Sequence, residues 1–256
     1  MTTLVTIALL AGSLMMLSCG VATAETAPST AKGDYVVLLH GLGRTAVLMK
    51  RAEWFLKARG YRVVNETYPS RQFSIEQLAD GWLKELLEAR ISDSNVPVHF
   101  VTHSLGGIVL RQYLSNHRVE NLGRVVMLAP PNHGSAIMDR QKNHFVSRKV
   151  LGPAGEQLGT SAKDGPGRLG PVDFECGVIA GDRSLNPFLA SALSGPNDGK
   201  VTVESARIAG MRDFIILPST HTWIAWRART LGQVLSFLRS GRFLHEGSSS
   251  LIEKTV

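Results

Sequence analysis

The sequence has only two cysteines, Cys19 and Cys176, among 256 residues. Small domains that depend on disulfides carry more cysteines at closer spacing, so no disulfide framework is expected. If Cys19 is removed or lipidated, Cys176 stands alone and an intrachain disulfide is excluded. Cys176 begins an apolar run typical of a buried strand, where a free thiol behaves as a small hydrophobic side chain.

Metal-ligand clusters, internal repeats and long basic runs are also missing. We therefore expect no metal and no other cofactor. The net charge is +7, but lysines and arginines are scattered without interleaved aromatics, which argues against nucleic-acid binding. Such a basic surface would instead assist a peripheral approach to anionic lipid headgroups. The sequence leaves the oligomeric state open.

The N-terminal apolar run, Leu4 to Leu17, is too short to span a bilayer comfortably. Residues 1–24 resemble a secretory signal peptide that ends in small residues, although its start lacks the usual positive charge. We therefore expect export to the periplasm or the medium. The alternative is a membrane-anchored lipoprotein, because Met16–Cys19 loosely resembles a lipobox with Cys19 as its lipidated residue.

The most informative motif is the apolar run Val98–Thr102, which continues through His103 and Ser104 into two glycines and a helical pattern. This order is typical of a nucleophile elbow, in which a tight turn lifts a serine hydroxyl above the sheet. Gly106 would allow the strand and the helix to approach closely. Thr102 stands where the pattern expects glycine and would need small neighbours. The alternative is a buried turn without chemistry.

A second apolar strand, starting at Tyr35, ends in His-Gly-Leu-Gly at residues 40–43. Glycines at a strand end let backbone N–H groups face a ligand. The N–H groups of Leu42 and Leu105 would hold the oxyanion of a tetrahedral intermediate. A histidine at position 40 more often supports such a loop than acts as a base. We expect three residues of these two loops at the substrate pocket: His40, Gly41 and His103.

Candidates for the acid and the base follow the serine in the order Ser…Asp…His. Asp198 lies in a Pro/Asn/Gly-rich turn, and His221 follows the apolar strand Phe214–Leu217. A serine hydroxyl is a weak nucleophile until an imidazole accepts its proton, and a carboxylate must orient that imidazole. Asp182 is a rival acid because it also follows a strand, but the adjacent Arg183 favours an ion pair or a turn cap there.

These motifs together resemble the bacterial lipase and esterase branch of the α/β-hydrolase superfamily. The resemblance rests on four segments: residues 40–43, residues 102–107, Asn-Asp-Gly-Lys-Val at 197–201 and the late His221. Residues 131–135 are similar to a Pro-His-x-Gly-Ser element of those lipases, with an extra asparagine before His133. We expect His133 at the edge of the pocket. The similarity extends over about residues 34 to 240.

The resemblance implies a serine hydrolase that cleaves carboxylic esters, of the kind derived from lipids, through an acyl-enzyme. It implies Ser104 as nucleophile, Asp198 as acid and His221 as base, with Leu42 and Leu105 as oxyanion donors. An acyltransferase or a thioesterase would use the same residues with another acceptor or substrate. A non-catalytic binding protein could also share the fold, since fold does not dictate activity.

The alternation of apolar runs predicts an α/β fold: a mostly parallel sheet of about six strands with helices on both faces. The expected strands lie near 36–39, 62–66, 98–102, 124–129, 176–181 and 213–217, and the expected helices near 45–59, 75–91, 105–116 and 222–239. Residues 34–243 would form this domain and 244–256 a flexible tail. The Gly/Pro-rich segment 132–175 is either a small cap or lid over Ser104 or an excursion without a role.

Overall fold

The computed structural model describes residues 33–142, 145–163, 165–186, 191 and 193–245. The expected signal peptide, residues 1–24 with Cys19, lies outside these residues, as do residues 246–256 of the expected tail 244–256. No helix among the described residues has the length and apolar character needed to cross a membrane.

Six strands form one parallel sheet in the order β2-β1-β3-β4-β5-β6. The strands are β1 (Tyr35–Leu39), β2 (Arg62–Asn65), β3 (Val98–His103), β4 (Leu122–Leu128), β5 (Cys176–Gly181) and β6 (Asp213–Leu217). The strand order reverses between β1 and β3, where Leu39 pairs with Thr102. Ligands of open parallel sheets bind beyond the carboxyl ends of the strands at such a switch point.

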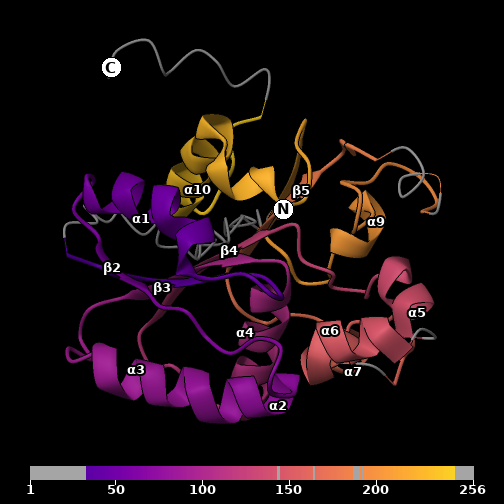
Figure 1. Ribbon diagram of the computed structural model, residues 1–256. Helices are drawn as coiled ribbons and strands as arrows, with labels where there is room; N and C mark the ends of the chain where they lie inside the picture. Colours follow the sequence, from indigo (N-terminus) through magenta and orange to yellow (C-terminus); the bar gives the residue numbers. More distant parts are fainter. Residues whose placement is uncertain (1–32, 143–144, 164, 187–190, 192, 246–256) are drawn as a thin grey trace, which may run out of the picture.

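Helices cover both faces of the sheet (Figure 1). One face carries η1 (Ala46–Met49), α1 (Lys50–Lys57), η3 (Trp223–Trp226) and α10 (Ala228–Ser240), and the other carries α2 (Ile75–Gln77), η2 (Leu78–Leu83), α3 (Lys84–Arg90) and α4 (Leu105–Asn116). Successive residues of a strand point to opposite faces. Accordingly Val36 and Leu38 pack with α1 and α10, while Val37 and Leu39 pack with α3 and α4.

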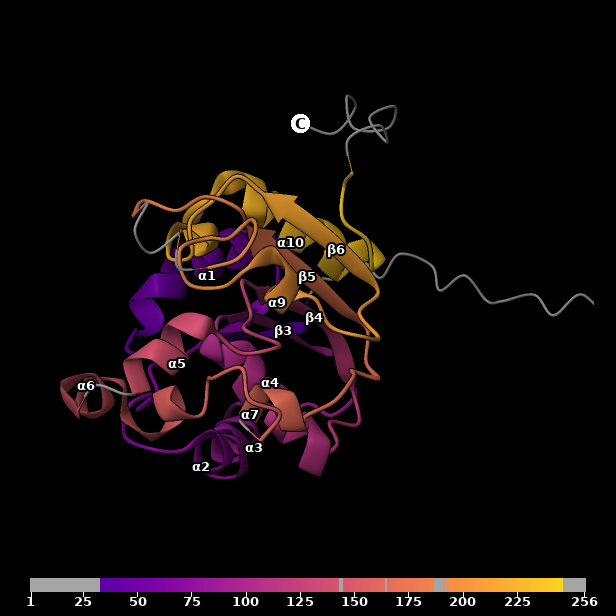
Figure 2. The same ribbon diagram turned by 90° about the vertical axis from the view of Figure 1, so that its right-hand side faces the viewer.

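The segment after β4 carries α5 (Ala136–Lys142), α6 (Phe145–Glu156) and α7 (Gly165–Arg168). These helices gather to one side of the sheet, as the two ribbon views show (Figures 1 and 2). The short α9 (Val203–Ala206) precedes β6. Helix α6 is bent at Gly152, whose φ of 69° is unfavourable for other residues. A Cβ at Gly152 would lie 1.9 Å from the Arg71 carbonyl oxygen, so this bend packs directly on the loop after β2.

Arg111 on α4 attaches this segment to the core. Its guanidinium is buried and donates to the carbonyl oxygens of Asn132 (3.2 Å), Pro166 (3.5 Å) and Gly170 (2.7 Å). Burial lowers the Arg111 pKa to about 10. The asparagine that distinguishes the 131–135 element also serves this junction, because the Asn132 side chain donates to the Ala206 carbonyl.

The predicted α/β fold is confirmed, and each observed strand lies within two residues of its expected bounds. Three expected helices are less regular than their hydrophobic spacing indicates. The helix expected near 45–59 begins as the 3-10 helix η1 before it continues as α1. The helix expected near 75–91 contains the π-helical turn η2, and the helix expected near 222–239 is interrupted at Arg227, whose ψ of 134° is extended. Hydrophobic periodicity reports which face is buried and is insensitive to such local changes of hydrogen bonding.

Candidate active site

Ser104 occupies a strained turn between β3 and α4. Its backbone has φ 54° and ψ −121°, and Ala129 is the other non-glycine residue with positive φ in the described part of the chain. The Ser104 N–H donates to the Leu128 carbonyl at the end of β4 (2.9 Å). Helix α4 begins at the next residue, so the serine stands at the carboxyl edge of the sheet in the geometry of a nucleophile elbow.

The glycines after the serine make this turn sterically feasible. A Cβ on Gly106 would lie 2.6 Å from the Leu39 carbonyl oxygen, closer than real Cβ atoms come. A Cβ on Gly107 would lie 3.2 Å from the Thr102 hydroxyl oxygen. The fully buried Thr102 is therefore accommodated beside Gly107. This explains why threonine is tolerated at position 102, where the elbow pattern expects glycine.

Ser104, His221 and Asp198 form one hydrogen-bonded chain. The Ser104 hydroxyl lies 3.0 Å from His221 Nε2, and His221 Nδ1 lies 2.8 Å from Asp198 Oδ2. All three side chains are buried. The other carboxylate oxygen of Asp198 accepts the N–H groups of Lys200 (2.9 Å) and Val201 (2.8 Å). This fixes the carboxylate so that Nδ1 of His221 donates to it and Nε2 can accept the serine proton.

The rival acid Asp182 does not take part in this chain. Its carboxylate lies 3.5 Å from the Arg183 guanidinium, the ion pair that the adjacent arginine favoured in the sequence. Gly181 ends β5 and brings Asp198 to the sheet, since a Cβ at Gly181 would lie 3.0 Å from the Asp198 Cβ.

The expected oxyanion donors lie on the two neighbouring strand ends. Leu42 lines the pocket in a turn closed by the bond from the Arg44 N–H to the Gly41 carbonyl (3.1 Å). A Cβ on Gly41 would lie 3.2 Å from the Ser104 Cβ, so glycine permits this turn to approach the serine. Leu105 begins α4, and the first N–H groups of a helix have no intrahelical acceptor. The oxyanion role of both groups stays a prediction.

His40 supports this turn from inside the protein. Its ring is fully buried, donates from Nδ1 to the Gly41 carbonyl (2.9 Å) and accepts the Tyr68 N–H at Nε2 (3.1 Å). The ring also stacks on Tyr68 with centroids 4.0 Å apart. Burial lowers the His40 pKa to about 4. The expectation that His40 lies at the substrate pocket therefore needs correction, because both ring nitrogens are engaged away from it.

The expected pocket-edge position of His133 is also corrected. The residue is exposed and does not line the pocket; Ser135, two residues further on, does. The sequence motif located the turn, but the direction of each side chain on it depends on contacts with α9, where the Ser205 carbonyl accepts the His133 N–H.

His103 lines the pocket as expected and has an additional role that sequence reasoning missed. Its Nε2 donates to the backbone carbonyl of His221 (2.8 Å), so it holds the loop that carries the imidazole. Burial, and then the charge of His221, lower the His103 pKa well below that of an ordinary histidine. His103 therefore remains a neutral support for the loop.

A pocket of about 320 Å³ opens above Ser104 and His221. Part of its wall is apolar and comes from the segment 132–175: Ile137, Met138, Val150, Leu151 and Leu158. Three cationic side chains also line it: Arg44, Arg71 and Lys200. The sequence motifs assigned no role to these cations, although Lys200 belongs to the 197–201 motif. The segment 132–175 thus contributes to the pocket, and its opening as a lid stays a prediction.

A sequence profile of the alpha/beta hydrolase family matches residues 36–244. The chain therefore belongs to this family, as the motifs predicted. No curated protein matches the chain in sequence.

Solved structures share the fold at low sequence identity. The mature lipase BlEst2 of Bacillus licheniformis is 21% identical with a TM-score of 0.63, covering 84% of this chain and 95% of its own. The metagenomic carboxyl esterase MGS0156 is 21% identical with a TM-score of 0.61, and the match covers 77% of this chain and 67% of the esterase. A thermophilic esterase from Thermogutta terrifontis is 14% identical with a TM-score of 0.58, and the match covers 82% of this chain and 91% of that esterase.

Proposed function

We propose that this protein is a serine hydrolase that cleaves carboxylic esters. The single observation that carries the proposal is the hydrogen-bonded chain from Ser104 through His221 to Asp198, with donor–acceptor distances of 3.0 and 2.8 Å at a pocket. Nucleophile, base and orienting carboxylate in this arrangement meet the geometric requirements of nucleophilic catalysis. The lipase and esterase names of the structural neighbours support the same class of reaction.

In the proposed reaction the Ser104 hydroxyl attacks the acyl carbon while His221 Nε2 accepts its proton. The N–H groups of Leu42 and Leu105 stabilise the oxyanion. His221 then donates the proton to the leaving alcohol, and Asp198 stabilises the imidazolium while it exists. Water, deprotonated by His221, attacks the acyl-enzyme and releases the acid.

Labelling with a fluorophosphonate probe tests the proposal, because the probe reacts with an activated serine. We expect the protein to be labelled, Ser104→Ala to lose the label, and Ser115→Ala, a control further along the same helix, to keep it. We expect His221→Ala to lose turnover by on the order of a thousandfold or more. Labelling retained in Ser104→Ala would refute the assignment, and an unlabelled native protein would favour a non-catalytic role.

A further inference from the structure

The three cations of the pocket come from separate parts of the chain. Arg44 follows β1, Arg71 follows β2, and Lys200 stands two residues after Asp198. Within the described residues none of them lies within ion-pair distance of a carboxylate, and neither Asp nor Glu lines the pocket with them. Other cations of the protein do pair: Arg90 with Glu66, Arg124 with Glu175 and Arg168 with Glu76. The pocket therefore gathers three cations, and the nearby charge of Asp198 offsets that of Lys200 only in part.

Lys200 is held close to the reacting groups. Its N–H donates to Asp198 and its carbonyl accepts the Ser135 hydroxyl (2.7 Å). The side chain is partly buried, and burial followed by the charge of Arg44 lowers the Lys200 pKa. An ammonium that is partly removed from water next to another cation is destabilised until a negative charge binds.

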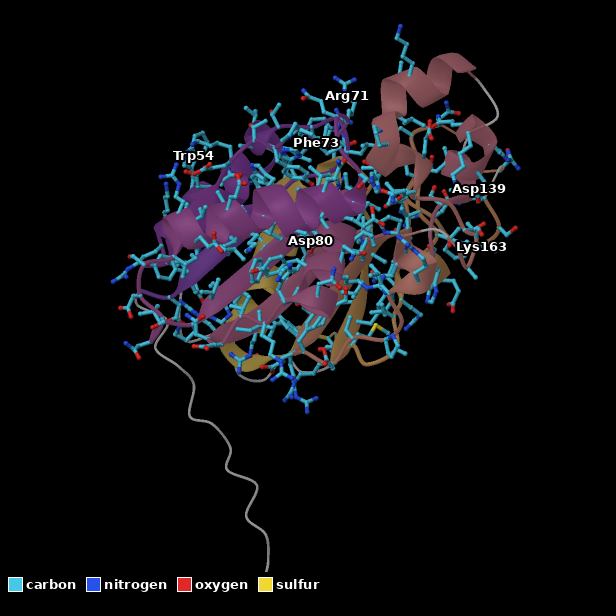
Figure 3. All side chains as sticks on the ribbon, turned by 90° about the horizontal axis from the view of Figure 1, so that it is seen from below. Trp54, Arg71, Phe73, Asp80, Asp139 and Lys163 are labelled. Carbon is cyan, nitrogen blue, oxygen red and sulfur yellow. The ribbon has the colours of Figure 1, made fainter. Side chains whose placement is uncertain are left out.

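Arg44 and Arg71 extend the positive charge outward from Ser104. A second hollow of about 570 Å³ shares both arginines with the pocket and adds Lys149. The bend of α6 at Gly152 packs on the backbone of Arg71. The loop that carries Arg71 therefore lies beside α6, within the segment 132–175. Figure 3 shows Arg71 and Phe73 near the outline of the molecule in this view. The apolar side chains of the same pocket provide a surface for an acyl chain.

We propose that the substrate is an acyl ester or thioester whose leaving group carries a phosphate, and that Arg44, Arg71 and Lys200 bind this phosphate. The inference rests on the proposed function and specifies its substrate class. Guanidinium groups match phosphate oxygens in geometry, and three cations exceed the charge of one phosphate monoester. A lysophospholipid and an acyl-coenzyme A both carry this combination of acyl group and phosphate.

The test compares two esters with the same acyl chain at fixed ionic strength: monooctanoylglycerol and monooctanoylglycerol phosphate. We expect kcat/KM to be about 10-fold or more higher for the phosphate ester, because a hydrogen bond between charged groups typically contributes this much. Arg71→Gln should reduce this preference about 10-fold. Arg59→Gln is the matched control, because Arg59 is exposed and precedes the amino end of β2, at the opposite edge of the sheet; it should retain the preference.

Equal kcat/KM for the two esters would overturn the phosphate site while leaving the hydrolase proposal intact. The same loss of preference in Arg59→Gln would also overturn it, because a general charge effect would then suffice. Octanoyl-coenzyme A is the third substrate and distinguishes the two sources of phosphate. A kcat/KM above that of the phosphate ester indicates an acyl-coenzyme A, and a lower value indicates a lysophospholipid.

If neither ester is hydrolysed, the proposed function fails and binding alone tests the site. We then expect octyl phosphate to bind about 10-fold more tightly than octanol in calorimetry, with the difference lost in Arg71→Gln. Equal binding of octyl phosphate and octanol would refute the site independently of catalysis.

Discussion

Ser104 adopts a backbone conformation that L-residues seldom tolerate, and its surroundings maintain it. The bond from its N–H to the Leu128 carbonyl and the start of α4 at the next residue hold the turn. Strain of this kind costs of the order of 1–3 kcal/mol and clusters at functional sites. The local sequence predicted this turn because an apolar strand followed by serine, leucine and two glycines is typical of a nucleophile elbow.

The strain at Ser104 can be measured with two variants that both remove the hydroxyl. Ser104→Gly also removes the Cβ that disfavours a φ of 54°, whereas Ser104→Ala keeps it. We expect the glycine variant to unfold in urea with a free energy about 1 kcal/mol higher than the alanine variant. Equal stability, or a more stable alanine variant, would show that the turn is relaxed.

At the scale of elements, β1 and β3 end side by side because they pair in the sheet, and α4 packs closely against the end of β1. Gly106 makes this contact possible, since its Cβ position lies 2.6 Å from the Leu39 carbonyl oxygen. The short Leu-Gly-Gly sequence predicted the close approach of the elements. The contact between Thr102 and Gly107 was not predictable. The two residues are five apart in the sequence, and the conformation of the turn between them decides whether they touch.

Two glycine-to-alanine variants separate this contact from ordinary helix propensity. Gly106→Ala places a methyl group against the backbone of β1, and we expect it to lower the free energy of unfolding by about 1–3 kcal/mol. Gly232→Ala lies in α10, where a Cβ meets no atom within 4 Å, and we expect a gain of about 0.5–1 kcal/mol. Urea unfolding measures both; a neutral Gly106→Ala would contradict the steric argument.

At the scale of the whole molecule, buried histidines make stability depend on pH. Burial lowers the pKa of His40 to about 4 and that of His103 well below an ordinary histidine. The unfolded chain therefore binds protons near its own histidine pKa, while the folded protein binds them only at lower pH. The stability contributed by these neutral rings is complete above the unfolded pKa and is lost as the pH falls toward the folded pKa.

We expect the free energy of unfolding in urea to fall between about pH 7 and about pH 5.5, by up to about 1.4 kcal/mol per pH unit for each titrating histidine. His40→Gln should flatten this dependence even if it lowers stability at neutral pH, because one of the protons is no longer taken up. An unchanged slope in His40→Gln would show that the ring is not neutral in the folded protein.

The sequence by itself determined the parallel sheet, its strand ends and the three residues that meet there. Hydrophobic runs set the strands, and the carboxyl ends of parallel strands share one edge. Only the tertiary structure decided that His40 faces inward, that His133 faces solvent, and that Arg44, Arg71 and Lys200 line one pocket. Burial and side-chain direction depend on contacts between segments distant in the chain, which local patterns do not encode.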